Sequence, residues 1–254
     1  MRGCSRIGGG VVVLLAVACN VVGGTSRPPV EREVVVSSGT VAGGSLETCE
    51  RAERVVTGVR YRRPGRLVGD VDGDGNEDRV FVAVDERSRR GCGAFVAADT
   101  GDVLLAAPIA DDFISFELGL PALKALASIN PTAGREIVVD VSAGASTQFA
   151  AVFTVAAGRL SRVTVPGASN PLSFAYGGGV GHVAGIDCES DGRIVISSAT
   201  PRRARYRLTR HFADARGIVW RLDRAATERV LVSLKGLRAY PEFVRSPFGS
   251  CGAP

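Results

Sequence analysis

The chain has 254 residues, of which 45% are apolar, 22% charged and 6% aromatic, and its formal net charge is +5 at pH 7. This length suits one or two domains, and the apolar fraction is sufficient for a folded core, which excludes a largely disordered chain. Val, Ala and Gly predominate over aromatic residues. Such a composition favours short strands and turns over a helical bundle.

The N-terminal segment has the layout of an export signal. Arg2 and Arg6 precede an apolar run from Val11 to Ala18, which is too short to cross a bilayer as a helix. The small residues of Ala16-Val17-Ala18 predict cleavage after Ala18, so that residues 1–18 form a signal peptide. Without Arg2 and Arg6 the chain keeps 29 of its 31 basic residues against 26 acidic ones, and this mild net charge of +3 does not support nucleic acid as a partner.

Cys19 becomes the N-terminal residue after that cleavage. The segment ending in LLAVAC resembles a bacterial lipoprotein signal, which implies acylation of Cys19 and attachment of the chain to the membrane surface. An ordinary secreted protein, in which Cys19 has no such role, is the alternative. Residues 19–45 are rich in Gly, Ser, Pro and Val and are interpreted as the anchor and a flexible tether, with one short strand expected at Val34 to Val36. Residues 46–254 form the predicted domain, in an extracytoplasmic location.

Four further cysteines belong to the predicted domain. An even number of cysteines outside the cytoplasm favours two disulfides, which can connect in three ways. The preferred pairing ties each half of the domain to a neighbouring segment. A zinc site is the rival, and it is disfavoured because the sequence contains no C-x₂-C pair. The preferred bridges are Cys49–Cys92 and Cys188–Cys251.

Three stretches of the domain resemble one another when they are aligned. They begin at Leu67, Leu126 and Val183, which lie 59 and 57 residues apart, and each passes from a few apolar or small residues through a polar loop to alternating Val and Ile. A period of about 58 residues is typical of propeller blades or solenoid repeats. The domain is therefore predicted to be all-β, a small or partial β-propeller-like arrangement of about three to four blades.

Local patterns also predict turns and helices between these stretches. Turns are expected at Ala157-Gly158 and within Asp214 to Gly217, each between two runs with the composition of strands. Two segments are candidate helices, Pro121 to Ala127 and Ala225 to Lys235, and the second of them is stopped by Gly236.

Residues 69–84, GDVDGDGNEDRVFVAV, crowd four aspartates into a short loop ahead of a strand pattern. Alternate residues of a tight loop can direct their oxygens to one centre, and Ca²⁺ takes about six to eight oxygen ligands. The aspartates would supply carboxylates and the asparagine its backbone carbonyl, while two glycines allow the positive φ angles of the loop. One Ca²⁺ site is therefore predicted, and an Asp/Gly-rich turn that binds nothing is the alternative. The candidate ligands stand at loop positions 1, 3, 5, 7 and 9: Asp70, Asp72, Asp74, Asn76 and Asp78.

The loop is not an EF-hand, because position 12 is Phe81 within a strand pattern, where an EF-hand has Glu followed by a helix. The pattern D-x-D-G-D-G-x-x-D before an apolar strand instead resembles the calcium loop of FG-GAP, or VCBS-type, repeats in integrin α-like β-propellers. The resemblance covers Leu67 to Val84 and implies that the four aspartates are ligands in a loop joining two strands of a blade. Neither of the other two similar stretches retains the ligand set, so one Ca²⁺ is expected.

Together these features predict an exported, lipid-anchored, Ca²⁺-binding domain that acts as a binding or structural module at the cell surface and not as an enzyme. Its expected partners are the membrane, through the anchor, and a surface ligand or protein that no motif identifies. The alternative is an extracytoplasmic hydrolase that uses the carboxylate cluster as its catalytic centre. His182 and His211 are the only histidines, and neither stands in a motif typical of Ser-His-Asp or zinc hydrolases.

Overall fold

The computed structural model divides the chain into two units, Met1–Glu31 and Arg32–Pro254, and every residue that it describes belongs to the second unit. The predicted signal peptide, Cys19, Cys49 and Cys92 lie outside the described residues, so their roles stay predictions. No helix in the described ranges is both long enough and apolar enough to span a membrane. These ranges are 32–37, 52–87, 93–109, 114, 116–131, 134–179 and 181–252.

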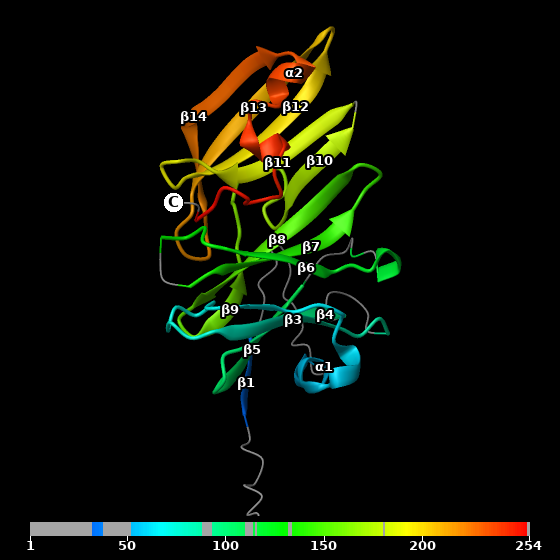
Figure 1. Cartoon of the computed structure of the whole chain (residues 1–254), viewed down its shortest axis with the longest axis vertical. Coiled ribbons are helices and arrows are strands. Elements are labelled where there is room, and N and C mark those ends of the chain that lie inside the picture. The colour runs from blue at the N-terminus through cyan, green and yellow to red at the C-terminus, as the bar shows by residue number, and fades with distance from the viewer. Residues whose placement is uncertain are drawn as a thin grey trace, which may run out of the picture. The chain divides into compact units, whose positions relative to one another are not determined.

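The first sheet contains five strands in the described part of the chain (Figure 1). They lie in the order β1-β5-β4-β3-β2, and every neighbouring pair is antiparallel except β1 and β5, which are parallel. The short strand expected at Val34 to Val36 is confirmed as β1, so this part of the predicted tether belongs to the sheet. The strands are β1 (Glu33–Val36), β2 (Leu67–Gly69), β3 (Asp78–Val84), β4 (Ala94–Asp99) and β5 (Val103–Pro108).

The second sheet contains the other nine strands of the described residues, all paired antiparallel. Their order is β14-β13-β12-β11-β10-β8-β7-β6. β8 pairs with β10 at its beginning and with β9 at its end, so it links two halves of the sheet. The strands are β6 (Ala122–Ala127), β7 (Glu136–Ala143), β8 (Thr147–Ala156), β9 (Arg159–Arg162), β10 (Phe174–Gly179), β11 (His182–Cys188), β12 (Ile194–Arg202), β13 (Arg205–Asp214) and β14 (Arg221–Val232).

Apolar side chains on both faces of the strands stack these elements in layers. Val80 and Val82 of β3 share one core with Phe153 of β8, between the two sheets. Phe81, between them in sequence, enters a different core on the opposite face of the first sheet. Because both faces of β3 are covered, the strand is apolar without interruption from Val80 to Val84.

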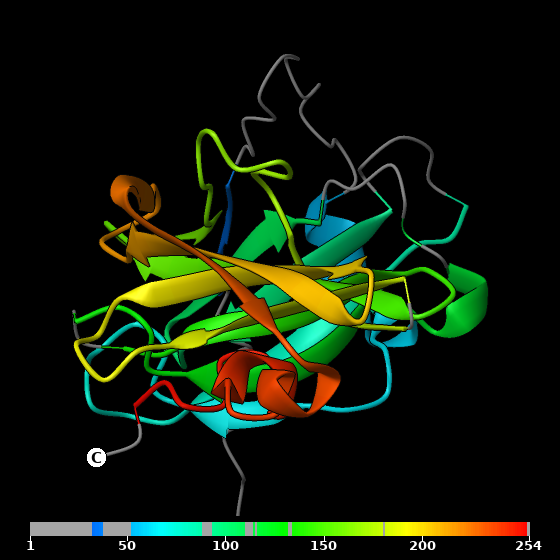
Figure 2. The same ribbon diagram turned by 90° about the horizontal axis from the view of Figure 1, so that it is seen from above.

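Another core lies between the two halves of the second sheet. Val152 of β8, Ile186 of β11 and the fully buried Trp220 contribute to it. Trp220 stacks on Phe174, with ring centroids 5.6 Å apart, and Phe248 meets both rings edge-on. The strands of successive layers cross obliquely when seen from above (Figure 2), as is expected of twisted sheets.

Short helices cover the outer faces of the stack. α1 (Ala52–Thr57), which is followed by η1 (Val59–Tyr61), packs in the same core as Phe95 of β4. At the other face, Leu237 of α2 (Leu234–Leu237) and Phe243 of η3 (Pro241–Phe243) pack with Leu208 of β13. A further turn of helix, η2 (Phe116–Leu118), precedes β6.

The all-β prediction is confirmed, whereas the propeller arrangement stays a prediction because neither sheet closes on itself within the described residues. Each of the three similar stretches folds locally as an antiparallel hairpin, formed by β2 and β3, by β6 and β7, and by β11 and β12. The aspartate loop connects the two strands of the first of these hairpins, β2 and β3.

Both candidate helices are wrong. Residues 122–127 form β6, which pairs with β7, and residues 221–232 form β14, which pairs with β13. A helix begins only at Leu234, after Ser233, whose hydroxyl accepts a hydrogen bond from the Gly236 amide. The Ala, Glu and Arg residues of β14 favour a helix in isolation, but the exposed edge of β13 offers a ladder of backbone partners that outweighs this weak local preference.

The predicted turns are confirmed. Ala157 and Gly158 connect β8 and β9 with φ angles of 50° and 70°, and two consecutive positive φ angles are typical of the tightest hairpin turn. The other turn lies at Gly217 and Ile218, at the end of the predicted segment, while Asp214 is still the last residue of β13.

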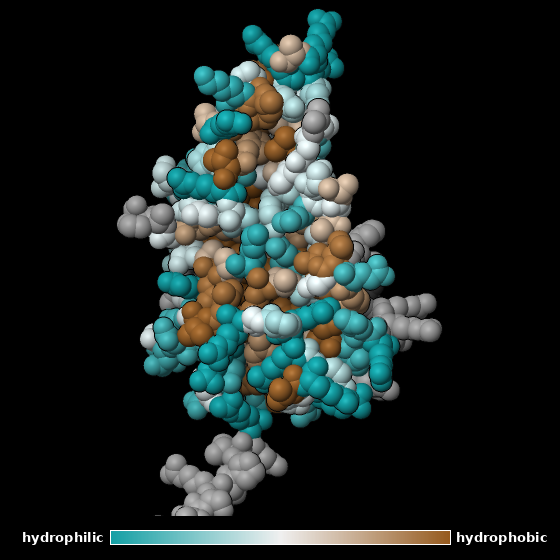
Figure 3. Space-filling model, turned by 45° about the vertical axis from the view of Figure 1, so that its right-hand side comes forward, coloured by the Kyte–Doolittle hydropathy of each residue, from teal (hydrophilic) through white to brown (hydrophobic). Residues whose placement is uncertain are grey.

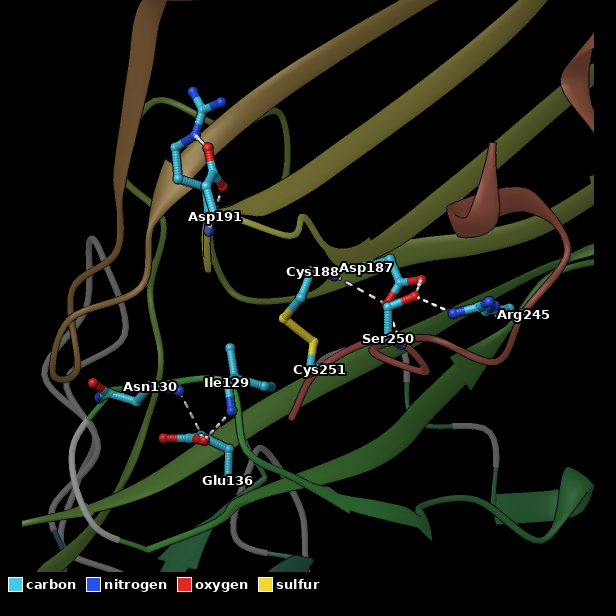
Figure 4. Close-up of a disulfide and its surroundings, with 10 residues drawn as sticks. Ile129, Asn130, Glu136, Asp187, Cys188, Asp191, Arg245, Ser250 and Cys251 are labelled. Atoms are coloured by element: carbon cyan, nitrogen blue, oxygen red, sulfur yellow. Dashed lines mark hydrogen bonds and ion pairs between the residues drawn. A yellow bond between two sulfur atoms is a disulfide. The ribbon is translucent and has the colours of Figure 1, made fainter. Parts of the chain in front are cut away.

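One of the two preferred disulfides is confirmed. Cys188 at the end of β11 is bonded to Cys251, with Cα atoms 4.9 Å apart (Figure 4). The bridge holds the C-terminal segment against the loop of the third hairpin. Its proposed companion, Cys49–Cys92, lies outside the described residues.

Candidate metal centre

The aspartate loop is the connection between β2 and β3. Its two ends are held together because Gly69 and Asp78 are opposite each other in the antiparallel register. Gly73 and Gly75 have φ angles of 83° and 87°, which confirms that the glycines supply the left-handed turns of the loop.

Three of the five predicted ligands lie together. Ligand oxygens of Asp70, Asp72 and Asp78 are all within 4.8 Å of one another. Asp74 is not part of this group of carboxylates, and the role predicted for the Asn76 carbonyl stays a prediction. The Asp74 carboxylate instead accepts hydrogen bonds from the backbone amide and the side-chain amide of Asn76, at 2.7 and 2.8 Å.

Hydrogen bonds to backbone amides hold the clustered carboxylates in place. Asp70 accepts from the amides of Gly73 and Gly75, at 2.6 and 3.0 Å, so its carboxylate lies inside the curve of the loop. Asp78 accepts from the Val71 amide at 2.7 Å. These bonds fix where the oxygens point before any ligand is present.

Burial and mutual repulsion make the cluster electrostatically costly. Asp78 is 1% exposed, and burial raises the pKa of its carboxyl, with a further upward contribution from the charges of Asp72 and Asp74. The pKa of the exposed Asp74 is lowered by its hydrogen bonds to Asn76. The group that most disfavours its own charge is therefore the one at the buried end of the cluster.

The loop of the second hairpin supports the aspartate loop from one side. The Arg135 amide donates to the Asp70 carbonyl at 2.9 Å. Gly134 has a φ of 94°, and a Cβ atom added to it would lie 2.7 Å from the Val71 carbonyl oxygen. Glycine is therefore required at this position both by its backbone conformation and by the close approach of the two loops.

The second hairpin has a buried carboxylate of its own in the corresponding place. Glu136, 2% exposed, is the first residue of β7 as Asp78 is the first residue of β3. Its carboxylate accepts hydrogen bonds from the amides of Ile129 and Asn130, at 2.9 and 3.2 Å (Figure 4), and from the Thr154 hydroxyl at 3.3 Å. Burial raises the pKa of Glu136, and these hydrogen bonds partly offset the effect.

The loop of the third hairpin is held by the C-terminal segment. Asp187, 1% exposed, accepts hydrogen bonds from the Ser250 amide and hydroxyl, both at 2.7 Å, next to the disulfide (Figure 4). Arg245 in turn donates to the Ser250 hydroxyl at 2.6 Å. Asp191 lies apart from Asp187 and pairs with Arg193.

The sequence did not predict the roles of Glu136 and Ser250. A signal for Glu136 exists, because it aligns with Asp78 once the second stretch is given a one-residue deletion in its loop. The contact between Asp187 and Ser250 joins residues 63 apart, and its only signal in the sequence is the predicted bridge between the residues that follow them, Cys188 and Cys251. His182 and His211, the candidates for acid-base chemistry, lie in β11 and β13 of the second sheet.

The arrangement of the aspartate loop is suited to holding a hard cation, since all of its side-chain donors are oxygens. No family model, curated protein or solved structure was found to match this chain.

Proposed function

We propose that this chain is an exported, lipid-anchored Ca²⁺-binding module of the cell surface, in which the loop between β2 and β3 holds one ion. The observation that carries the proposal is the convergence of Asp70, Asp72 and Asp78 within 4.8 Å. Three carboxylates at this separation repel one another, and a dication relieves the repulsion for all of them together.

The donor set fits Ca²⁺ better than a transition metal. Carboxylate and carbonyl oxygens suit hard cations, whereas Zn²⁺ and Cu²⁺ favour sulfur and imidazole ligands. Asp70, Asp72 and Asp78 would hold the ion from the positions they occupy, and Asp74 and the Asn76 carbonyl complete the predicted set. The ion's contribution is structural, because it fastens the β2–β3 loop against the loop that contains Gly134.

The wider context of the proposal rests on the N-terminal sequence and on the layered sheets. Residues 1–18 and Cys19 support export and anchoring, and the three stacked hairpins are consistent with a partial propeller whose outer faces are covered by short helices. Stacked sheets of this kind present loops and edges to a partner, so the module serves recognition or support at the surface.

Calorimetry of the full-length chain tests the metal site. Thermal unfolding with Ca²⁺ and with a chelator should differ, because an ion that binds only the folded state stabilises it by about 2.7 kcal/mol at 100-fold excess over Kd. Isothermal titration should give one site with a Kd on the order of 10⁻⁴ to 10⁻³ M, the range of extracellular calcium modules. Identical unfolding in both buffers, together with no heat on titration, contradicts the proposal.

Single substitutions distinguish aspartates that bind the ion from aspartates that do not. Asp72→Asn should remove the Ca²⁺-dependent stabilisation, and Asp74→Asn should weaken binding several-fold while leaving stability in chelator unchanged, because Asp74 is exposed and its carboxylate accepts its hydrogen bonds from the neighbouring, exposed Asn76. Asp102→Asn, at an exposed aspartate in the turn between β4 and β5, is the matched control and should behave as wild type.

A further inference from the structure

A hollow of about 530 Å³ opens where α1 and η1 meet the end of β3. Hydrophilic side chains gather over the lower part of the domain in Figure 3, the part where Figure 1 places α1 and the first sheet. We call this site the arginine hollow. Its lining residues are Arg54, Arg60, Tyr61, Arg62, Arg63, Pro64, Val84, Asp85, Glu86 and Arg87.

The charges around the arginine hollow are unbalanced. Five arginines face two acidic residues, so the lining carries a net charge of +3. Arg63 pairs with Glu86 at 3.0 Å. Within the described part of the chain, the guanidinium groups of the other arginines, Arg54, Arg60, Arg62 and Arg87, lie beside no carboxylate at ion-pair distance.

Aromatic rings position two of these unpaired guanidinium groups. Arg62 lies over the Phe81 ring, 4.0 Å from its centroid, and Arg60 lies over the Tyr61 ring at 4.6 Å and donates to the Tyr61 hydroxyl. Stacking covers a face of the guanidinium plane and leaves N–H groups along its edge free to donate. Less side-chain entropy is then lost when a ligand accepts those bonds.

The backbone beneath them is also fixed. Arg62 forms a bridge with Ala83, and the Arg63 amide donates to the Val82 carbonyl at 2.8 Å, so this segment is attached to β3. The Arg63 side chain donates to Glu86 and to the Leu120 carbonyl, while its Nε is buried with no hydrogen-bond partner. A buried donor without a partner lowers the stability of the fold. A hydrogen bond from this Nε to an oxyanion, either direct or through a bridging water, would satisfy it.

We infer that the arginine hollow binds a phosphate group, carried either by a small phosphate ester or by a phospholipid headgroup. Planar guanidinium groups match the oxygens of phosphate in pairs. A phosphate monoester, with up to two negative charges, balances more of the +3 lining than a single carboxylate does, whereas the diester of a lipid headgroup carries one charge. The volume exceeds that of the phosphate group alone and falls in the range of small-molecule sites, so it accommodates the organic part of the ligand as well.

The arginine hollow is separate from the aspartate loop. Asp78 begins β3 and Val84 ends it, and a strand of this length spans about 20 Å. Loss of calcium binding and loss of phosphate binding are therefore expected to be independent, and Asp72→Asn should leave phosphate binding unchanged.

Titration of the full-length chain with sodium diphosphate tests the inference. Wild type should bind saturably at one site. Arg60→Gln combined with Arg62→Gln should weaken binding by about tenfold or more, because the variant loses the charge-assisted hydrogen bonds that the two stacked guanidinium groups donate to the phosphate. A second pair, Arg54→Gln with Arg87→Gln, should weaken it too while keeping the stacked residues. The control pair, Arg205→Gln with Arg207→Gln, removes the same charge from exposed positions of β13 and should bind as wild type.

Cosedimentation identifies the source of the phosphate. Binding to vesicles that contain phosphatidylglycerol, above that to phosphatidylcholine alone and lost in both hollow variants, identifies a lipid headgroup. Loss of diphosphate binding alone identifies a soluble ester. No saturable diphosphate binding by wild type, or equal binding by wild type, both hollow variants and the control pair, overturns the inference.

Discussion

The loops of the first and second hairpins both use a buried carboxylate to bind their own backbone amides, but they contain different numbers of acidic residues. In each, the first residue of the second strand is a buried acid whose carboxylate accepts backbone amides of its own loop: Asp78 from Val71, and Glu136 from Ile129 and Asn130. The second loop needs no further carboxylate to close.

The difference indicates what the extra acids of the first loop are for. One buried carboxylate is enough to hold a hairpin loop in this fold, so the demands of the turn do not account for Asp70 and Asp72 beside Asp78. Asp70 does bind two loop amides, but Asp72 lies in the cluster and accepts only the Asp74 amide, at 3.1 Å. A cation supplies the compensating charge that the second loop does not require.

The largest effect is expected from Glu136→Ala. This change leaves the amides of Ile129 and Asn130 buried without partners and should lower the free energy of unfolding by about 4 kcal/mol, at about 1–3 kcal/mol for each amide. Urea denaturation with a chelator present measures it.

Glu136→Gln is the matched control, because its amide oxygen can still accept from both backbone amides and its NH₂ can donate to the Thr154 hydroxyl. It should cost less than about 1.5 kcal/mol. Equal destabilisation by the two variants would show that Glu136 does not act through these hydrogen bonds.

A somewhat smaller effect is expected from Gly134→Ala, which disturbs the contact between the two loops. The added Cβ would lie 2.7 Å from the Val71 carbonyl oxygen at a φ of 94°, and the free energy of unfolding should fall by about 3 kcal/mol. Ca²⁺ affinity should fall as well, since Arg135 donates to the Asp70 carbonyl next to the collision.

Gly65→Ala provides the comparison. Gly65 has nearly the same backbone conformation, with a φ of 98°, but nothing lies within 4 Å of its added Cβ. It should cost about 1 kcal/mol, the conformational strain alone, and should leave Ca²⁺ affinity intact. Equal effects of the two substitutions on affinity would contradict support of one loop by the other.

The smallest effect concerns pH. Burial raises the pKa of Glu136 above its ordinary value of 4.5, so between 4.5 and the folded-state pKa the native state binds more protons than the unfolded state. Its contribution to stability is full below pH 4.5 and is lost as the pH rises through the folded-state pKa, with a slope of at most about 1.4 kcal/mol per pH unit. Glu136→Gln has no carboxyl group at this position, so its stability lacks this dependence on pH.

Urea denaturation of wild type and Glu136→Gln across this range, in chelator, measures the difference. The stability of the variant relative to wild type should increase with pH above 4.5. A relative stability that stays constant with pH would mean that folding does not shift the pKa of Glu136.

Local patterns were sufficient for those parts of the structure that depend on local chemistry. The all-β composition, the turn at Ala157-Gly158 and the glycine turns of the aspartate loop all followed from composition or neighbouring residues. The Cys188–Cys251 bridge was the preferred one of three connectivities that counting left open. The helix predicted at Ala225 to Lys235 failed because its partner, β13, is specified elsewhere in the chain. Where the local preference for a helix is weak, pairing with a strand edge that is available in the folded chain determines the conformation.

The candidate site shows the same division. Spacing alone brought Asp70, Asp72 and Asp78 into one prediction, but it could not show that Asp74 is directed to Asn76. Nor could it find the support from Gly134 and Arg135, which belong to a different hairpin and approach only after the two sheets pack.

The parallel pairing of β1 with β5 has a mechanical consequence. β1 lies at the start of the second unit, directly after residues 1–31. Its residues Glu33 to Val36 pair with Val103 to Ala106. Arg32, just before the strand, forms an ion pair with Asp99. Tension on that leading segment, directed along the strand, strains the whole ladder at once in shear instead of peeling its bonds apart in turn. Within the described residues, a pull on Arg32 along the strand direction would therefore load this short strand first.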